Sequence, residues 1–89
     1  MVRGAMDGGV TAKALGRALR ERRTSLGLTA REVGAKIPID RTYVESVERG
    51  ERNPSLESLS RLAAALDAPL SVLMSRAEQI GAESSSDAG

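Results

Sequence analysis

TAREVGAKIPIDRTYVESVERGERN, residues 29–53, is the stretch of sequence that decides the fold. Thr29 and Glu32 have the spacing of a capping box, in which each side chain bonds the backbone N–H of the other residue. A helix is therefore expected to begin near Ala30. It is expected to end before Pro38, because the residue that precedes a proline is pushed out of the helical conformation.

A second helix follows over 41–49, and Asp40 is placed to accept a hydrogen bond from its first turn as an N-cap. Gly50 suits the left-handed conformation that ends many helices. Val44 and Val47 form the apolar side of this helix. Its opposite, solvated side is expected to carry Arg41, Thr42, Glu45, Ser46 and Arg49.

Three further helical patterns surround these two. Apolar residues recur at helical spacing from Ala12 to Leu26, from Leu56 to Leu66 and from Leu70 onward. We read the second of these, beginning with Leu56 after Ser55 as its N-cap, as a pure core helix. The chain is thus predicted to be all-α, with a flexible N-terminal arm at 1–11, one five-helix domain at 12–80 and a disordered tail at 81–89.

The amino-acid composition excludes several classes of function. The 89 residues suffice for one domain and include no Cys and no His, which removes disulfides, thiol or histidine catalysis and the usual zinc ligands. We expect neither an enzyme nor a metal, a cofactor or a small-molecule ligand. The net charge is only +1, but residues 12–78 hold 12 Lys and Arg against 9 Asp and Glu. Without a long apolar run or signal segment, a cytoplasmic, nucleoid-associated protein with no membrane contact is expected.

The linked motifs LGRALRERRTSLGLT, REVGAKI, RTYVESVERGERNPSL and LSRLAAALDAPLSVLM resemble the Cro/phage-repressor (XRE-like) family over about residues 15–75. This resemblance implies a compact, lambda-repressor-like domain whose second and third helices form a helix-turn-helix. It also implies a transcriptional regulator that binds a palindromic DNA operator as a homodimer. The string RTYVESVERGERN is most similar to the small controller proteins of restriction–modification systems.

In this family the helix at 41–49 would lie in the major groove, with its first residues facing base edges. Arg41 and Thr42 are then the expected base-reading residues, and Ser46 is a third candidate. Glu45 would either accept from cytosine or hold Arg41 or Arg49 in place. Phosphate contacts are expected from the helix start at Ala30 and from Arg31, Arg49, Arg52 and Asn53.

The resemblance also assigns structural roles. Arg23 is expected to pair with Glu48 and so to join the first helix to the end of the reading helix. The homodimer is expected to form through Leu70, Val72, Leu73 and Met74. One departure from the family concerns the turn, where Pro38 replaces the usual glycine of positive φ, a conformation that we expect proline not to adopt.

Two alternatives remain open. The same fold serves protein-interaction modules such as antitoxins, which bind a partner protein rather than reading DNA. A regulator that activates transcription would also need an acidic patch for RNA polymerase, and Glu48, Glu51 and Glu57 could supply it.

Overall fold

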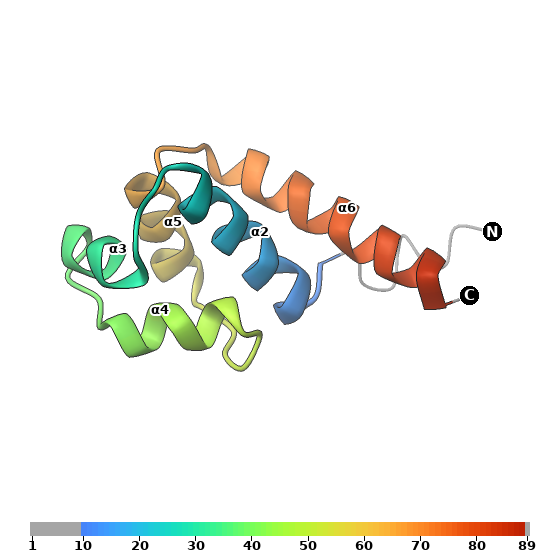
Figure 1. Ribbon diagram of the computed structural model, residues 1–89, viewed down its shortest axis with the longest axis horizontal. Helices are drawn as coiled ribbons and strands as arrows, with labels where there is room; N and C mark the ends of the chain where they lie inside the picture. Colours follow the sequence, from blue (N-terminus) through green and yellow to red (C-terminus); the bar gives the residue numbers. More distant parts are fainter. Residues whose placement is uncertain (1–9, 89) are drawn as a thin grey trace.

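The computed structural model describes residues 10–88, and Figure 1 shows the arrangement of its helices. Helices account for all the regular secondary structure within this range. The prediction of an all-α, five-helix domain is confirmed. The helices are α2 (Ala12–Ser25), α3 (Ala30–Lys36), α4 (Arg41–Glu48), α5 (Leu56–Ala65) and α6 (Leu70–Ala88).

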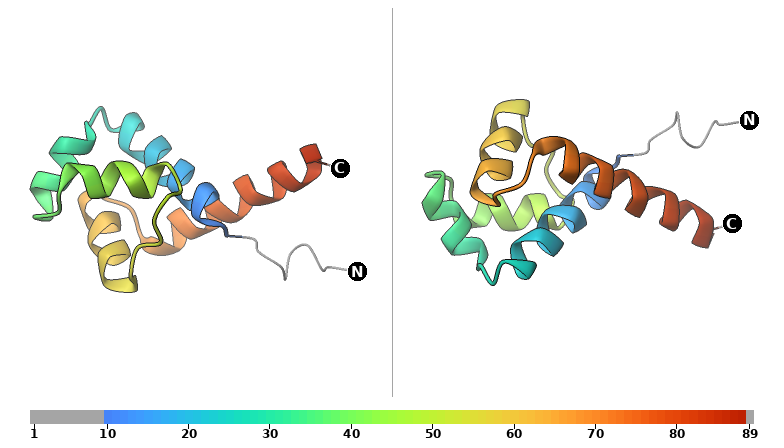
Figure 2. Two further views of the ribbon diagram at one scale, coloured as in Figure 1. Left: turned by 90° about the horizontal axis from the view of Figure 1, so that it is seen from below. Right: turned by 90° about the horizontal axis from the view of Figure 1, so that it is seen from above.

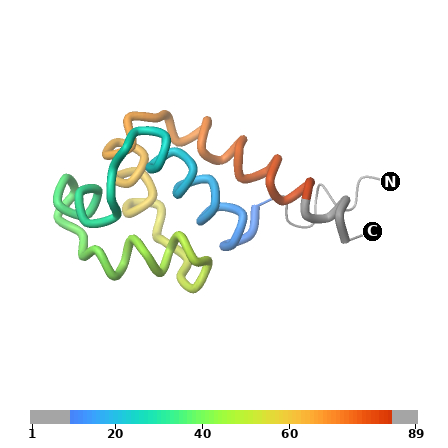
Figure 3. The backbone as a smooth tube through the Cα atoms, in the orientation of Figure 1, coloured from blue at the N-terminus to red at the C-terminus, as the bar shows by residue number. Residues whose placement is uncertain are grey.

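Helix α2 lies between α4 and α6 and packs against both (Figure 1). Helices α3 and α4 pack together, and α5 contacts α3 and α6. The backbone trace in Figure 3 shows how short the connection between α3 and α4 is. One side of α4 therefore rests on the other helices, and its other side faces away from them.

The core is built almost entirely from aliphatic side chains, as the lack of Phe and Trp requires. Val33, Val44 and Val47 bring the helix-turn-helix into this core, each at most 2% exposed. In α6 the residues Leu73, Ala77 and Ile80 are buried. The buried apolar residues are Ala14, Leu15, Ala18, Leu19, Ala30, Val33, Ile37, Val44, Val47, Leu59, Leu62, Ala63, Ala65, Leu66, Leu73, Ala77 and Ile80.

Side-chain caps begin four of the helices. The capping box of Thr29 and Glu32 is present, and the Thr29 hydroxyl accepts from the Glu32 N–H at 3.1 Å. Asp40 caps α4 and Ser55 caps α5, as their positions in the sequence predict. Thr11, which we expected in the N-terminal arm, instead caps α2 by accepting from the Ala14 N–H.

Four helices end in the same way, with one residue of positive φ after the last turn. That residue is Gly27 after α2, Pro38 after α3, Gly50 after α4 and Asp67 after α5. The expectation that proline would not take this conformation is wrong, since Pro38 has a φ of 24°. The turn keeps its shape because the Ile39 N–H donates to the Gly34 carbonyl at 2.9 Å.

The C-terminal end of the described chain differs from the sequence prediction. Helix α6 runs on to Ala88, through most of the stretch 81–89 that we expected to be a disordered tail. Ala, Glu and Ser are tolerated in helices, and after Gly81 no glycine or proline interrupts this stretch before Gly89. Figure 2 shows the C-terminal part of α6 extending beyond the other helices. The arm predicted at 1–11 falls largely outside the described residues.

Leu56 does not belong to the core. It is 73% exposed at the start of α5, whereas Leu59 and Leu62 further along the helix are buried. Within residues 10–88, no helix combines the length and the apolar character that crossing a membrane requires.

Candidate nucleic-acid interface

Two glycines allow the close contacts that hold α4 in place. A Cβ atom on Gly34 would lie 2.3 Å from the Ile39 carbonyl oxygen, so the turn between α3 and α4 has no room for a side chain. A Cβ atom on Gly16 would lie 2.4 Å from the Glu48 carbonyl oxygen. Helix α2 thus touches the backbone at the end of α4, a contact that the sequence analysis missed.

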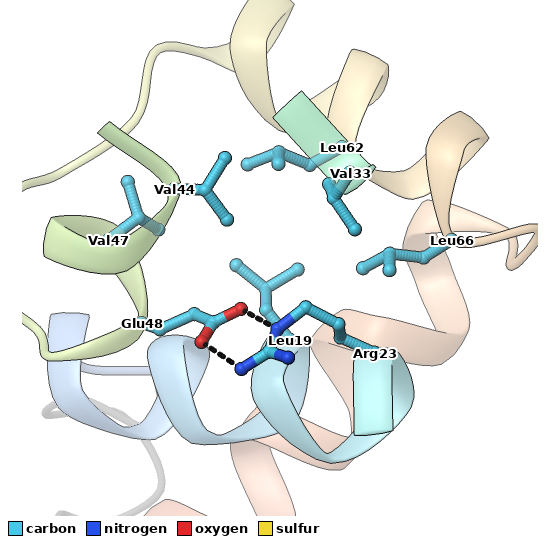
Figure 4. Close-up of a pocket in the computed structure, with 8 residues that line it drawn as sticks. All are labelled: Leu19, Arg23, Val33, Val44, Val47, Glu48, Leu62 and Leu66. Atoms are coloured by element: carbon cyan, nitrogen blue, oxygen red, sulfur yellow. Dashed lines mark hydrogen bonds and ion pairs between the residues drawn. The ribbon is translucent and has the colours of Figure 1, made fainter. Parts of the chain in front are cut away.

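The expected ion pair between Arg23 and Glu48 is present beneath α4 (Figure 4). Arg23 Nε and Nη2 donate to the two Glu48 carboxylate oxygens at 2.7 and 2.9 Å, and Nη1 donates to the Leu28 carbonyl. The two side chains are only 14% and 8% exposed. The hydrogen bond to Glu48 raises the pKa of the Arg23 guanidinium above its usual value. The pair therefore ties the end of α4 to α2 and to the start of the helix-turn-helix.

The space around this pair is nearly filled. Figure 4 shows apolar side chains from α2, α3, α4 and α5 converging on it, and they leave a cavity of about 10 Å³. A volume of this size admits no organic ligand. The cavity is lined by Leu19, Arg23, Val33, Val44, Val47, Glu48, Leu62 and Leu66.

The outer side of α4 carries the residues expected to read bases. Arg41 and Thr42 occupy its first turn, and both are exposed. Glu45 lies one turn after Arg41, with 3.9 Å between its Oε2 and Arg41 Nε. The side chains of this pair are 57% and 42% exposed, so they form a loose contact in solvent. Of the two roles considered for Glu45, this contact fits the orientation of Arg41.

Ser46 is not on this outer surface. It is only 8% exposed, and its hydroxyl donates to the Tyr43 carbonyl at 2.8 Å. The chain folds back after α4, where the Glu51 N–H donates to the Ser46 carbonyl. Ser46 is therefore the least accessible of the predicted base-reading residues, and its base-reading role stays a prediction.

The residues predicted to contact phosphate have different surroundings. Arg49 pairs with Glu51 at 3.1 Å, and their hydrogen bond lowers the pKa of the Glu51 carboxyl while raising that of Arg49. The Arg52 guanidinium lies over the Tyr43 ring, 5.2 Å from its centre. Arg31 and Asn53 are exposed. Tyr43 thus packs against the core and also positions Arg52.

Ala30 is a weak candidate for phosphate binding. It is 7% exposed, and the Glu32 carboxylate accepts from the Thr29 N–H at 2.8 Å at the same helix start. A phosphate there would meet this negative charge. Helix α3 has only seven residues, which also limits its dipole.

Arg22 has a role that no local pattern indicated. Its Nε and Nη2 each donate at 2.8 Å, to the carbonyls of Leu66 and Asp67 respectively, and so hold the end of α5. These partners lie more than forty residues away in the sequence. Arg22 lies in a run of basic residues, and nothing in that run distinguishes its role from the roles of the neighbouring arginines.

The remaining cations are unevenly distributed over the surface. On α5 and α6, Arg61 pairs with Glu57 and Arg76 pairs with Glu21. Apart from Arg22, six cations have no ion-pair partner among the side chains described, those of residues 10–83, and every one lies on α2, on α3 or in the loop after α4. They are Lys13, Arg17, Arg20, Arg31, Lys36 and Arg52.

No group of Asp and Glu side chains in the described part of the chain is arranged to hold a metal ion. The exposed functional groups around α4 are the guanidinium groups of the Arg residues there, the hydroxyl of Thr42 and the amide of Asn53. These groups bind through hydrogen bonds and through charge. They suit a ligand that combines negative charge with hydrogen-bonding groups, as a nucleic acid does.

A family profile described as helix-turn-helix matches residues 19–73, which is more than half of the chain. The chain belongs to this Cro/repressor type of helix-turn-helix family. The match begins within α2 and ends within α6, so the family shares the whole arrangement around α4.

Three relatives within the helix-turn-helix family show the extent of the similarity. The transcriptional regulator ClgR of Mycobacterium tuberculosis is 42% identical over 60 residues, and the chain spans about half of its length, 54%. The control protein C.MunI of a Mycoplasma species is 41% identical over 61 residues, which cover 68% of this chain and 80% of that protein. The structure of the restriction–modification controller C.AhdI from Aeromonas hydrophila has a TM-score of 0.68 and 42% identity, covering 70% of this chain and 94% of its own.

Proposed function

We propose that this chain is a sequence-specific regulator of transcription that binds double-stranded DNA through the outer side of α4. The distribution of cations carries the proposal. Cations without an ion-pair partner lie on the elements around α4, whereas Arg61 and Arg76 on α5 and α6 are neutralised by neighbouring carboxylates. DNA phosphates are the natural counter-charge for such a surface.

Base reading is assigned to Arg41 and Thr42. Arg can donate two hydrogen bonds to guanine O6 and N7, and the Thr methyl can lie against the thymine methyl, each worth about 1–3 kcal/mol of discrimination. Glu45 orients Arg41 and repels phosphate, which lowers the affinity for unrelated sequences.

Phosphate contacts are assigned to Arg31, Arg49, Arg52 and Asn53. Arg49 would have to exchange Glu51 for a phosphate, and an exposed ion pair of this kind is easily given up. Arg52 is held over the Tyr43 ring, which reduces the conformational freedom that it would lose on binding.

A homodimer would place two copies of α4 about 34 Å apart on a palindromic operator, since one domain of this size covers only a half-site. Leu73 offers little surface to a partner, because it is 2% exposed within its own chain. Its spacing from Ala77 and Ile80 turns it toward α2. Leu70 and Met74 are half-buried, and Val72, at 55% exposed, is the residue of the predicted set most open to a partner.

The interface can be tested at Val72. Val72→Asp should give monomers in sedimentation while the helical signal is unchanged, because a charge there would be buried only in the dimer. Leu56→Asp is the matched control on α5. If Leu56→Asp alone dissociated the dimer, the interface would lie on α5.

Among regulators of this family, a restriction–modification controller is the second candidate. Its support is sequence similarity, since C.AhdI and C.MunI are 42% and 41% identical to this chain over the matched residues. A controller that also activates transcription would need carboxylates for RNA polymerase. Glu48 is removed from that set by its buried pair with Arg23, and Glu51 and Glu57 remain.

Selection from random double-stranded DNA at about physiological salt would test the proposed function. Nonspecific charge attraction is weak at that salt concentration, so only real sequence preference survives. An inverted repeat of fixed spacing is the expected result. A folded, dimeric protein that enriches no motif would contradict the proposal and would favour the antitoxin-like alternative, in which the partner is a protein.

A further inference from the structure

Helix α2 carries a line of exposed cations that the proposed reading surface does not use. Lys13, Arg17 and Arg20 are spaced by four and three residues, so they lie on successive turns of one side of the helix. All three are exposed, and the line spans about 10 Å at 1.5 Å per residue. We call these three residues the α2 stripe.

No residue of the α2 stripe forms an ion pair with a described carboxylate, although the charge of Glu21 acts on Arg17 from beyond ion-pair distance. The nearest carboxylate along α2 is that of Glu21, and both of its oxygens accept from Arg76, at 2.8 and 3.1 Å. Like charges one turn apart repel one another, and Lys13 lies in the first turn, where the helix dipole disfavours a cation. The isolated chain would be more stable with a carboxylate in this line.

The position of the α2 stripe connects it with α4. Lys13 lies against Gly50, where an added Cβ atom would be only 2.7 Å from Lys13 Cγ. Figure 1 shows the start of α2 beside the loop that follows α4. That loop carries Arg52 and Asn53, so the α2 stripe begins where the proposed phosphate contacts end.

We propose that the α2 stripe is a second phosphate-binding surface, which contacts the duplex flanking the half-site that α4 reads. This inference rests on the proposed function. Duplex DNA fits better than an acidic protein, because the line of the α2 stripe continues at Thr24 and includes no exposed apolar residue. Protein interfaces have an apolar or aromatic centre and are poor in Lys.

Contact with the α2 stripe requires the flank to bend toward α2. DNA bends most easily at pyrimidine–purine steps, so the flank should influence affinity although no side chain reads its bases. Each phosphate that is neutralised adds about 0.9 to the slope of log affinity against log salt. Removing two stripe cations should therefore reduce the slope by about 2.

The test compares two duplexes that carry the inverted repeat recovered by selection, one of about 20 base pairs and one with flanks extending it to about 40. Binding is measured by fluorescence anisotropy over a range of KCl concentrations for the wild type and for Arg17→Gln/Arg20→Gln. Arg61→Gln is the control, since it removes one exposed guanidinium from α5. Thermal unfolding shows whether each variant is folded.

The expected result is a slope that falls by about 2 on the long duplex and is unchanged on the short one, with no change for Arg61→Gln. Equal slopes for wild type and double variant on the long duplex would overturn the inference. An equal loss on both duplexes would overturn it as well, because the α2 stripe would then act within the half-site. If the wild type bound neither duplex, the proposed function itself would fail, and this inference with it.

Discussion

Helix α4 takes part in two Arg–Glu ion pairs, one on its inner side and one on its outer side. The inner pair, Arg23 with Glu48, has two hydrogen bonds of 2.7 and 2.9 Å and is largely buried. The outer pair, Arg41 with Glu45, is 3.9 Å apart and about half exposed. Burial decides what each pair does, since the inner one fixes where α4 lies and the outer one leaves Arg41 able to change partners.

The energetic difference follows from desolvation. Removing one partner of a buried ion pair leaves the other charge in a poorly solvated site, and this typically costs about 3–5 kcal/mol. An exposed pair at i,i+4 contributes only about 0.3–0.5 kcal/mol. Substitutions on the inner side of α4 should therefore lower the stability of the fold, and substitutions on its outer side should impair DNA recognition.

The largest effect is expected for Glu48→Ala. It should lower the free energy of unfolding by about 3–5 kcal/mol, because the Arg23 guanidinium would remain buried without its counter-charge. Glu45→Ala is the matched control and should change stability by at most about 0.5 kcal/mol. Urea denaturation of both variants measures these changes in the free energy of unfolding. Equal losses would mean that burial does not separate the two pairs.

The next effect is expected for Gly16→Ala. Helix propensity alone predicts a gain, since alanine inside a helix is favoured over glycine by about 0.5–1 kcal/mol. The new Cβ atom would, however, meet the Glu48 and Val47 carbonyl oxygens at 2.4 and 2.5 Å, and overpacking of this kind typically costs about 1–3 kcal/mol. We expect a net loss in thermal unfolding. A gain would show that α2 does not approach the end of α4 so closely.

A smaller effect of opposite sign is expected for Pro38→Gly. Proline is strained at a φ of 24°, and it lacks the N–H that Gly50 donates to the Val47 carbonyl in the matching turn after α4. Glycine would relieve both defects, and we expect a gain of about 1 kcal/mol, seen as a rise of about 4–8 °C in the melting temperature. Pro54→Gly, outside any positive-φ turn, should instead lower it. A fall for Pro38→Gly would indicate that proline fits this turn.

The smallest effect on stability is expected for Arg41→Ala. The loss of a loose, exposed pair should change the free energy of unfolding by no more than about 0.5 kcal/mol in urea denaturation. Arg61→Ala, from the other exposed i,i+4 pair, is the control and should behave alike. A loss above about 2 kcal/mol would give Arg41 a structural role and weaken its assignment to DNA.

The features that sequence reasoning located are those with local signals. Thr29 with Glu32, Asp40, Ser55 and Gly50 lie where a cap or a left-handed turn residue is needed, and short-range hydrogen bonding is enough to predict them. The pair of Arg23 and Glu48 spans 25 residues, and only the family resemblance pointed to it.

The features that it missed depend on which side of a helix meets another element. Ser46 has the helical spacing of an outward residue, but it is only 8% exposed and its hydroxyl donates to the Tyr43 carbonyl. Leu73 and Leu56 are both leucines at the start of a helix, yet one is 2% and the other 73% exposed. The packing of α4 against Gly16 of α2 has no local signature, because the contacting carbonyls of Val47 and Glu48 belong to a different helix.

The account of α4 is tested most directly by comparing the DNA motifs that the wild type and Arg41→Ala select from random duplexes. We predict that the wild type selects an inverted repeat and that the variant selects the same repeat with the preference lost at one position in each half-site. An Arg41→Ala motif that is identical to the wild type, or that is weakened equally at every position, would contradict the assignment of base reading to the outer side of α4.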